Sequence, residues 1–201
     1  MSDFSIIFID DNFNEMSTLV QTMSVEFPHA DVSHVFKDPE KGVEYVLGNL
    51  DKPMVVFVDW NYEGTTKKGL SVLRSIREKT SLLYVIMMSA NKIIKNKIQD
   101  SDIIEMMNAE SFYFFDSSND DADAVVLVKK VLRKMESKFD CVLEQWLIRH
   151  PEDKSKVVIR QNGFNYTWDD VLREVRMQTE FGMDFERKAN QSTIYRYKCS
   201  E

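Results

Sequence analysis

The sequence is poor in the residues that mark several protein classes. Among 201 residues there are two cysteines, six glycines and four prolines. Two cysteines, Cys141 and Cys199, provide neither a disulfide framework nor a zinc cluster. So little glycine and proline excludes collagen-like and low-complexity chains. Because no run of about 18 apolar residues occurs, we also expect no membrane span.

The charge balance excludes further classes. Lysine and arginine number 26 against 33 acidic residues, which gives a formal net charge of -7. This argues against nucleic-acid and polybasic membrane binders, because phosphate contacts need clustered cations. Residues 1–4 lack the basic-then-apolar layout of a secretory signal, so we expect a cytoplasmic, reduced protein.

Apolar runs alternate with helical patterns in the first two-thirds of the chain. The runs at 4–9, 54–58, 82–88 and 112–115 are unbroken, and 30–36 alternates. Helical spacing fills 13–27, 38–50, 69–79 and 91–108, with a fifth helix beginning at 119. Strands buried on both faces read as unbroken apolar runs, and helices between them imply parallel crossovers. The pattern predicts an α/β domain with a doubly wound, five-stranded parallel sheet of order 2-1-3-4-5.

The fifth helix is expected to be unusually long. Residues 119–150 contain neither glycine nor proline, which predicts one extended helix. Its apolar residues at heptad spacing are Val125, Val128, Leu132, Met135, Phe139, Val142 and Trp146. Two interpretations stay open: a homodimeric coiled coil through residues 125–146, or a helix that covers its own sheet and then the tail.

The tail after Pro151 is expected to form a small hairpin-plus-helix module. Asn162-Gly163 between two apolar runs, 157–161 and 164–168, predicts a hairpin with a type I′ turn. A capping box at 167–170 predicts the start of a helix that runs to about residue 178, and Gly182 is expected to end it. The residues after Gly182 form another helix or fray.

The basic residues of this tail do not favour DNA binding. Arg173 and Arg176 share their helix with acidic residues and indicate a solvated face, so DNA binding is a less favoured function for this tail. The expected domains are 1–136, a helical extension over 137–150, and a module over 151–201 that binds an unknown protein partner.

Acidic and hydroxyl side chains follow the predicted strands. Asp10 and Asp11 follow the first strand, Asp59 the third, Ser89 the fourth and Asp116 the fifth. Ligands of doubly wound sheets bind at this carboxyl edge. Three carboxylates converging there repel one another, and Mg²⁺ relieves that repulsion. An aspartate beside such a cation can attack a phosphoryl group, and a nearby hydroxyl can stabilise the phosphoryl oxygens.

Three stretches resemble the receiver domains of bacterial two-component response regulators. They are Ile-Phe-Ile-Asp-Asp at 7–11, Val-Phe-Val-Asp-Trp-Asn at 56–61 and Val-Ile-Met-Met-Ser-Ala at 85–90. The resemblance covers about residues 3–136. It implies phosphorylation by a sensor histidine kinase or a phosphotransfer protein, and output through protein–protein contacts near the fourth and fifth strands and the fourth helix.

The resemblance also implies individual roles. Asp59 would be the phosphoacceptor, and Asp10 and Asp11 would bind Mg²⁺ together with the backbone carbonyl of Asn61. Ser89 would contact the phosphoryl group. In the output surface, the residue at the family's aromatic switch position is Tyr113.

The sequence departs from the family after the fifth strand. Asp116 stands where the family has a lysine that pairs with the phosphoryl group. The reversed charge should strengthen cation binding and disfavour a phosphoryl dianion. Lys67 or Lys68 could supply a substitute cation, although exposed lysines are usually solvated. A working phosphorylated receiver and a phosphorylation-independent adaptor therefore both stay open.

A stand-alone enzyme is not expected. Phosphatases that depend on aspartate place two acids as Asp-x-Asp, whereas Asp10 and Asp11 are adjacent. No glycine-rich phosphate loop follows the first strand, which argues against nucleotide binding there.

Overall fold

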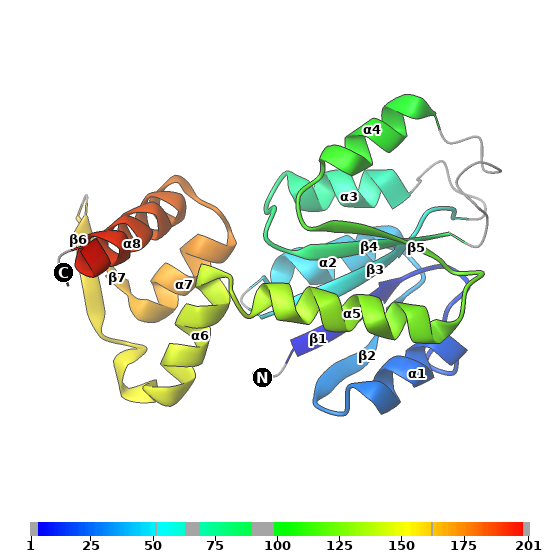
Figure 1. The fold of residues 1–201 in the computed structure, drawn as a ribbon, viewed down its shortest axis with the longest axis horizontal. Coiled ribbons are helices and arrows are strands. Elements are labelled where there is room, and N and C mark those ends of the chain that lie inside the picture. Colours follow the sequence, from blue (N-terminus) through cyan, green and yellow to red (C-terminus); the bar gives the residue numbers. More distant parts are fainter. Residues whose placement is uncertain (1–3, 51, 63–68, 90–98, 162, 199–201) are drawn as a thin grey trace. The chain divides into compact units, whose positions relative to one another are not determined.

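The chain forms two compact units, residues 1–133 and 134–201 (Figure 1). The computed structural model describes residues 4–50, 52–62, 69–89, 99–161 and 163–198. Among these residues, no helix combines the length and the hydropathy that a bilayer crossing requires.

A five-stranded parallel sheet organises the first unit. Its strands are β1 (Phe4–Ile9), β2 (Ala30–Phe36), β3 (Met54–Asp59), β4 (Tyr84–Ser89) and β5 (Phe112–Asp116). The strand order is β2-β1-β3-β4-β5, which confirms the predicted fold class. Both β1 and β4 are buried along their whole length, which explains their unbroken apolar sequences.

Helices cover both faces of this sheet. They are α1 (Thr18–Glu26), α2 (Pro39–Gly48), α3 (Gly69–Arg77), α4 (Asp100–Asn108) and α5 (Asp121–Met135). Figure 1 shows α1 and α5 on one face and α2 and α3 on the other. The start of α2 follows the sequence signal, because Asp38 accepts a hydrogen bond from the Glu40 amide and proline occupies the first helical position.

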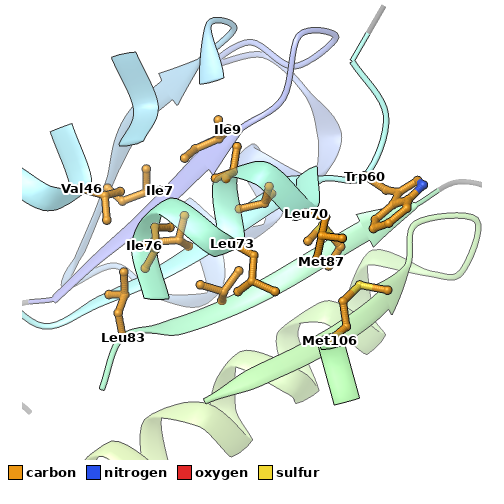
Figure 2. Packing of buried hydrophobic residues seen from close by; sticks show 14 of the residues in the cluster. Ile7, Ile9, Val46, Trp60, Leu70, Leu73, Ile76, Leu83, Met87 and Met106 are labelled. Atoms are coloured by element: carbon orange, nitrogen blue, oxygen red, sulfur yellow. The ribbon is translucent and has the colours of Figure 1, made fainter. Parts of the chain in front are cut away.

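A large apolar cluster lies between the sheet and helices α2, α3 and α4. Ile7 and Ile9 of β1 pack in this cluster with Val46 of α2 and with Leu73 and Ile76 of α3 (Figure 2). Residues alternate between the two faces of a strand, so the intervening Phe8 of β1 stacks on Phe57 of β3, with ring centroids 4.9 Å apart. Burial on both faces fixes the register of the strands and therefore the positions of the residues that follow them.

The prediction of one helix over residues 119–150 is wrong. Helix α5 ends at Met135, and a separate helix, α6 (Phe139–Arg149), occupies most of the expected extension over 137–150. Lys138 has an extended backbone with φ -75° and ψ 144°. The Ser137 hydroxyl donates to the Lys134 carbonyl at 3.0 Å. Such local bonds to the backbone compete with the helix, and neither glycine nor proline is needed to end it.

The break also divides the apolar residues at heptad spacing over residues 125–146, the heptad seam, between two separate helices. Val125 and Val128 are 5% and 0% exposed and belong to the core of the first unit. Val142 of α6 is 52% exposed. The first half of the seam is therefore used within its own unit, as one of the two interpretations predicted, and a coiled coil along the whole seam is not available.

The second unit begins with α6 and continues through a short 3-10 helix (Pro151–Asp153). It then contains strands β6 (Val157–Gln161) and β7 (Phe164–Thr167) and helices α7 (Trp168–Arg176) and α8 (Glu180–Lys198). The antiparallel hairpin is confirmed, and Gly163 in its turn has the expected positive φ of 82°. The predicted capping box is present, because Thr167 and Asp170 each accept a hydrogen bond from the other's backbone amide.

Two expectations about this unit are wrong. Gly182 does not end a helix but lies inside α8, where an added Cβ would be 2.2 Å from the Glu174 carbonyl oxygen. The glycine therefore allows α8 to approach the end of α7 closely.

Arg176 is not solvated: it is 4% exposed, and its guanidinium lies 3.2 Å from the carboxylates of Asp140 and Glu144.

Candidate functional site

Three aspartates meet at the carboxyl edge of the sheet in the first unit. Strands β1 and β3 are neighbours in register, with Ile9 opposite Val58, so the residues that follow Ile9 lie beside the end of β3. Ligand oxygens of Asp10, Asp11 and Asp59 all lie within 4.8 Å of one another. The structure thus brings together the three acids that the sequence placed at one site.

Burial and mutual repulsion make this site unfavourable for negative charge. Asp10 is 5% exposed, and burial raises its pKa even though the Asn12 amide donates to its carboxylate at 2.8 Å. The pKa of Asp59 is raised to about 7, first by burial and then by the charge of Asp10, with a smaller effect from Asp11. The Asn61 amide acts in the opposite direction. A cation placed among the three carboxylates would relieve this penalty.

The donor set fits Mg²⁺. Mg²⁺ prefers oxygen ligands and commonly uses a few carboxylates together with water. Asp10, Asp11 and Asp59 would hold the ion, and the Asn61 carbonyl stays a predicted additional ligand. A second group, His150, Glu152 and Asp153 in the other unit, also has its ligand atoms within 4.8 Å.

That second group differs in its electrostatics. The side chain of Glu152 is 63% exposed, and Asp153 already forms an ion pair with Lys156. Solvent and a lysine therefore compensate its charge, whereas in the aspartate group of the first unit Asp10 is buried and Asp11 and Asp59 are half-buried. The aspartate group is the better candidate metal centre of the two.

Ser89 and Asp116 lie at the same edge. Ser89 is 2% exposed and pairs in register with Asp116 at the ends of β4 and β5. One carboxylate oxygen of Asp116 accepts hydrogen bonds from the Ser118 amide at 3.0 Å and from the Ser118 hydroxyl at 2.6 Å. Among the described acidic residues, Asp116 is not part of the group within 4.8 Å. The Asp116 carboxylate is hydrogen-bonded within the turn that follows β5. This arrangement gives no support to the expectation that Asp116 strengthens cation binding.

Tyr113 is half-buried between β4 and α5. Its ring lies 6.3 Å from the ring of Tyr84, and the Lys130 ammonium lies 5.2 Å from its centroid. The switch role of Tyr113 stays a prediction. Lys67 and Lys68, the candidates for a substitute cation, lie outside the described residues.

The segment after β3 is held in place by contacts that the sequence analysis missed. The Trp60 amide donates to the Met88 carbonyl at 2.8 Å, and the Gly69 amide donates to the Trp60 carbonyl at 3.0 Å. The hydroxyl of Tyr62 donates to the Ile9 carbonyl at 2.8 Å. A large aromatic residue three positions after Asp59, within a polar stretch, was the available sequence signal for this last contact.

No family model and no curated protein matches the chain, but solved structures do. A response regulator receiver domain from Clostridium thermocellum matches with a TM-score of 0.50 and 18% identity, over 66% of this chain and 97% of that chain. The signal receiver domain of an HD domain-containing protein from Pseudomonas fluorescens Pf-5 matches with a TM-score of 0.50 and 12% identity, over 67% of this chain and 90% of that chain.

A longer protein also matches. NtrX from Brucella abortus, solved in complex with ATP, gives a TM-score of 0.53 and 15% identity over 88% of this chain. This chain spans 33% of that protein. At these identities the likeness establishes the fold, and the first unit of this chain has the fold of response regulator receiver domains.

Proposed function

We propose that the first unit is a receiver-type signalling unit that binds Mg²⁺ and accepts a phosphoryl group on Asp59. The observation that carries this proposal is the convergence of Asp10, Asp11 and Asp59 at the carboxyl edge of a receiver fold. The raised pKa of Asp59 supports it, because such a carboxyl gains most from a neighbouring cation.

The chemistry would be attack of an Asp59 carboxylate oxygen on the phosphorus of a phosphodonor. The new oxygen–phosphorus bond forms an acyl phosphate, and the leaving group departs with the electrons of the broken bond. Bound Mg²⁺ would neutralise charge on the phosphoryl oxygens. Asp10 and Asp11 would orient the ion, and the Ser89 hydroxyl would donate a hydrogen bond to a phosphoryl oxygen.

A phosphorylation-independent adaptor is the second candidate, and Asp116 favours it. Where receiver domains carry a lysine, this chain has a carboxylate that is bonded to Ser118. A negative group near the phosphoryl site would disfavour a dianion there. In this alternative the acids bind Mg²⁺, but Asp59 is not modified.

The proposed partners follow from the two candidates. A sensor histidine kinase or a phosphotransfer protein would supply the phosphoryl group in the first. In both, the output is a protein–protein contact, through the surface around Tyr113 or through the second unit.

Incubation with acetyl phosphate and Mg²⁺, followed by intact-mass measurement, tests the proposal. We expect one added phosphoryl group, absent in Asp59→Asn and retained in the control Asp100→Asn, whose residue is exposed on α4. Asp116→Lys should increase the yield, because it restores a cation near the phosphoryl group. Unmodified wild-type protein that nevertheless binds Mg²⁺ would favour the adaptor.

A further inference from the structure

Tyr62 connects the two strands that carry the aspartates. The side chain is 7% exposed, and its hydroxyl donates to the Ile9 carbonyl at 2.8 Å. Ile9 directly precedes Asp10, and Tyr62 lies three residues after Asp59. The hydrogen bond therefore joins the segment that follows β3 to the end of β1.

The surroundings of the phenol keep it a donor. Burial first, and then the charges of Asp59, Asp10 and Asp11, raise the pKa of Tyr62. The phenol therefore stays protonated at any physiological pH. Its hydrogen bond is made to a backbone carbonyl, so it contributes by holding the backbone beside the ligands.

We propose that Tyr62 is a positioning residue that holds Asp59 and the two acids that follow β1 at the spacing suited to Mg²⁺ and thereby favours Mg²⁺ over Ca²⁺. The inference rests on the proposed metal site. Mg²⁺ demands near-ideal octahedral geometry with ligands at about 2.0–2.1 Å, whereas Ca²⁺ accepts variable geometry at about 2.3–2.6 Å. A hydrogen bond that fixes the ends of β1 and β3 relative to each other should therefore affect the binding of Mg²⁺ more than the binding of Ca²⁺.

Titration calorimetry of the full chain with Mg²⁺ and, separately, with Ca²⁺ tests this inference. Tyr62→Phe removes the hydroxyl and keeps the ring. We expect its Mg²⁺ affinity to fall about tenfold, the lower end of the effect of outer-shell partners. Its Ca²⁺ affinity should fall less, so that the preference for Mg²⁺ declines.

The matched control is Tyr45→Phe. Tyr45 also has a hydroxyl bond, at 2.7 Å to Nε2 of His34, but it is not part of the acid group. The control should leave both affinities unchanged. Thermal unfolding reports whether each variant folds, and Tyr62→Leu serves as a second variant without the hydroxyl.

The outcomes separate this inference from the proposed function. Equal losses for Mg²⁺ and Ca²⁺ would indicate general loosening of the fold and overturn the positioning role. Unchanged Mg²⁺ affinity in a folded Tyr62→Phe or Tyr62→Leu protein would overturn it as well, while the proposed metal site would stand. A wild-type protein that binds neither ion would overturn the metal site itself and this inference with it.

Discussion

The carboxylates of Asp10 and Asp59 lie at the ends of neighbouring strands, and the charge of Asp10 helps to raise the pKa of Asp59 to about 7. An aspartate in the unfolded chain titrates near 3.8. The folded, metal-free protein therefore holds a proton on Asp59 over a pH range in which the unfolded chain has lost it. This relationship makes the stability of the first unit depend on pH, and a divalent cation bound at the proposed site would add to that dependence.

Asp59→Asn should stabilise the metal-free protein at pH 8. The pKa of Asp59 is raised on folding, so its ionisation reduces the free energy of unfolding as pH rises from about 4 to about 7. The change in pKa sets an upper bound of about 4 kcal/mol, and solvent screening of this partly exposed carboxyl should keep the measured effect well below that bound. At pH 4 the folded protein keeps the proton on Asp59 and the unfolded chain has lost only about half of it, so the advantage of the variant should be small.

Thermal melts of both proteins in a chelator, at pH 4 and at pH 8, measure this effect. Millimolar Mg²⁺ should stabilise the wild-type protein more than the variant, because an ion that binds only the folded state raises its stability. An equal melting temperature for the two proteins in chelator at pH 8 would show that Asp59 carries no such penalty.

Val128→Ala and Val142→Ala should have very different effects on stability. Val128 is fully buried in the first unit, so losing two methyl groups and leaving a cavity should cost about 2 kcal/mol. Val142 is 52% exposed on α6, and its truncation should cost less than about 0.5 kcal/mol. Urea unfolding measures both values. Similar large losses of stability at both positions would mean that Val128 and Val142 are both buried. That result would contradict the break in the heptad seam after Met135.

Removal of Arg176 should destabilise the second unit strongly. Its guanidinium is buried between Asp140 and Glu144, so Arg176→Ala would leave two acids without their cation and cost about 3–5 kcal/mol. The control Arg173→Ala removes a side chain that is 53% exposed and should cost less than about 1 kcal/mol. Trp146 and Trp168 lie in this unit, so tryptophan fluorescence during urea unfolding reports the change. A loss for Arg176→Ala no larger than that of the control would contradict the buried ion-pair network.

The sheet and the acid group could be predicted because their signals are local. Unbroken apolar runs show burial on both faces, and parallel strands place the residues that follow them along one edge. The sequence alone therefore predicts that Asp10 and Asp59 lie together. The hairpin turn could be predicted for the same reason, since Gly163 needs only its own backbone freedom.

The features that sequence reasoning missed depend on contacts between distant residues or on a single side chain. The partners of Arg176 lie 32 and 36 residues earlier in the chain, so its helical neighbours gave a misleading view of its exposure. The partner of Tyr62 lies 53 residues earlier. The end of α5 depends on the conformation around Ser137 and Lys138, two residues that a helix also accepts.

Gly69→Ala should weaken Mg²⁺ binding, whereas Gly48→Ala should not. An added Cβ at Gly69 would lie 2.2 Å from the Asp59 carbonyl oxygen, so the backbone that carries Asp59 must move. At Gly48, near the end of α2, an added Cβ would meet nothing within 4 Å. Alanine there should stabilise the helix by up to about 1 kcal/mol.

Calorimetric Mg²⁺ titration and thermal melts of both variants give the comparison. Because a shift of about 1 Å in one ligand is enough to spoil octahedral geometry, we expect about a tenfold lower affinity for Gly69→Ala. Wild-type affinity in that variant would mean that the Asp59 backbone adapts without moving its carboxylate.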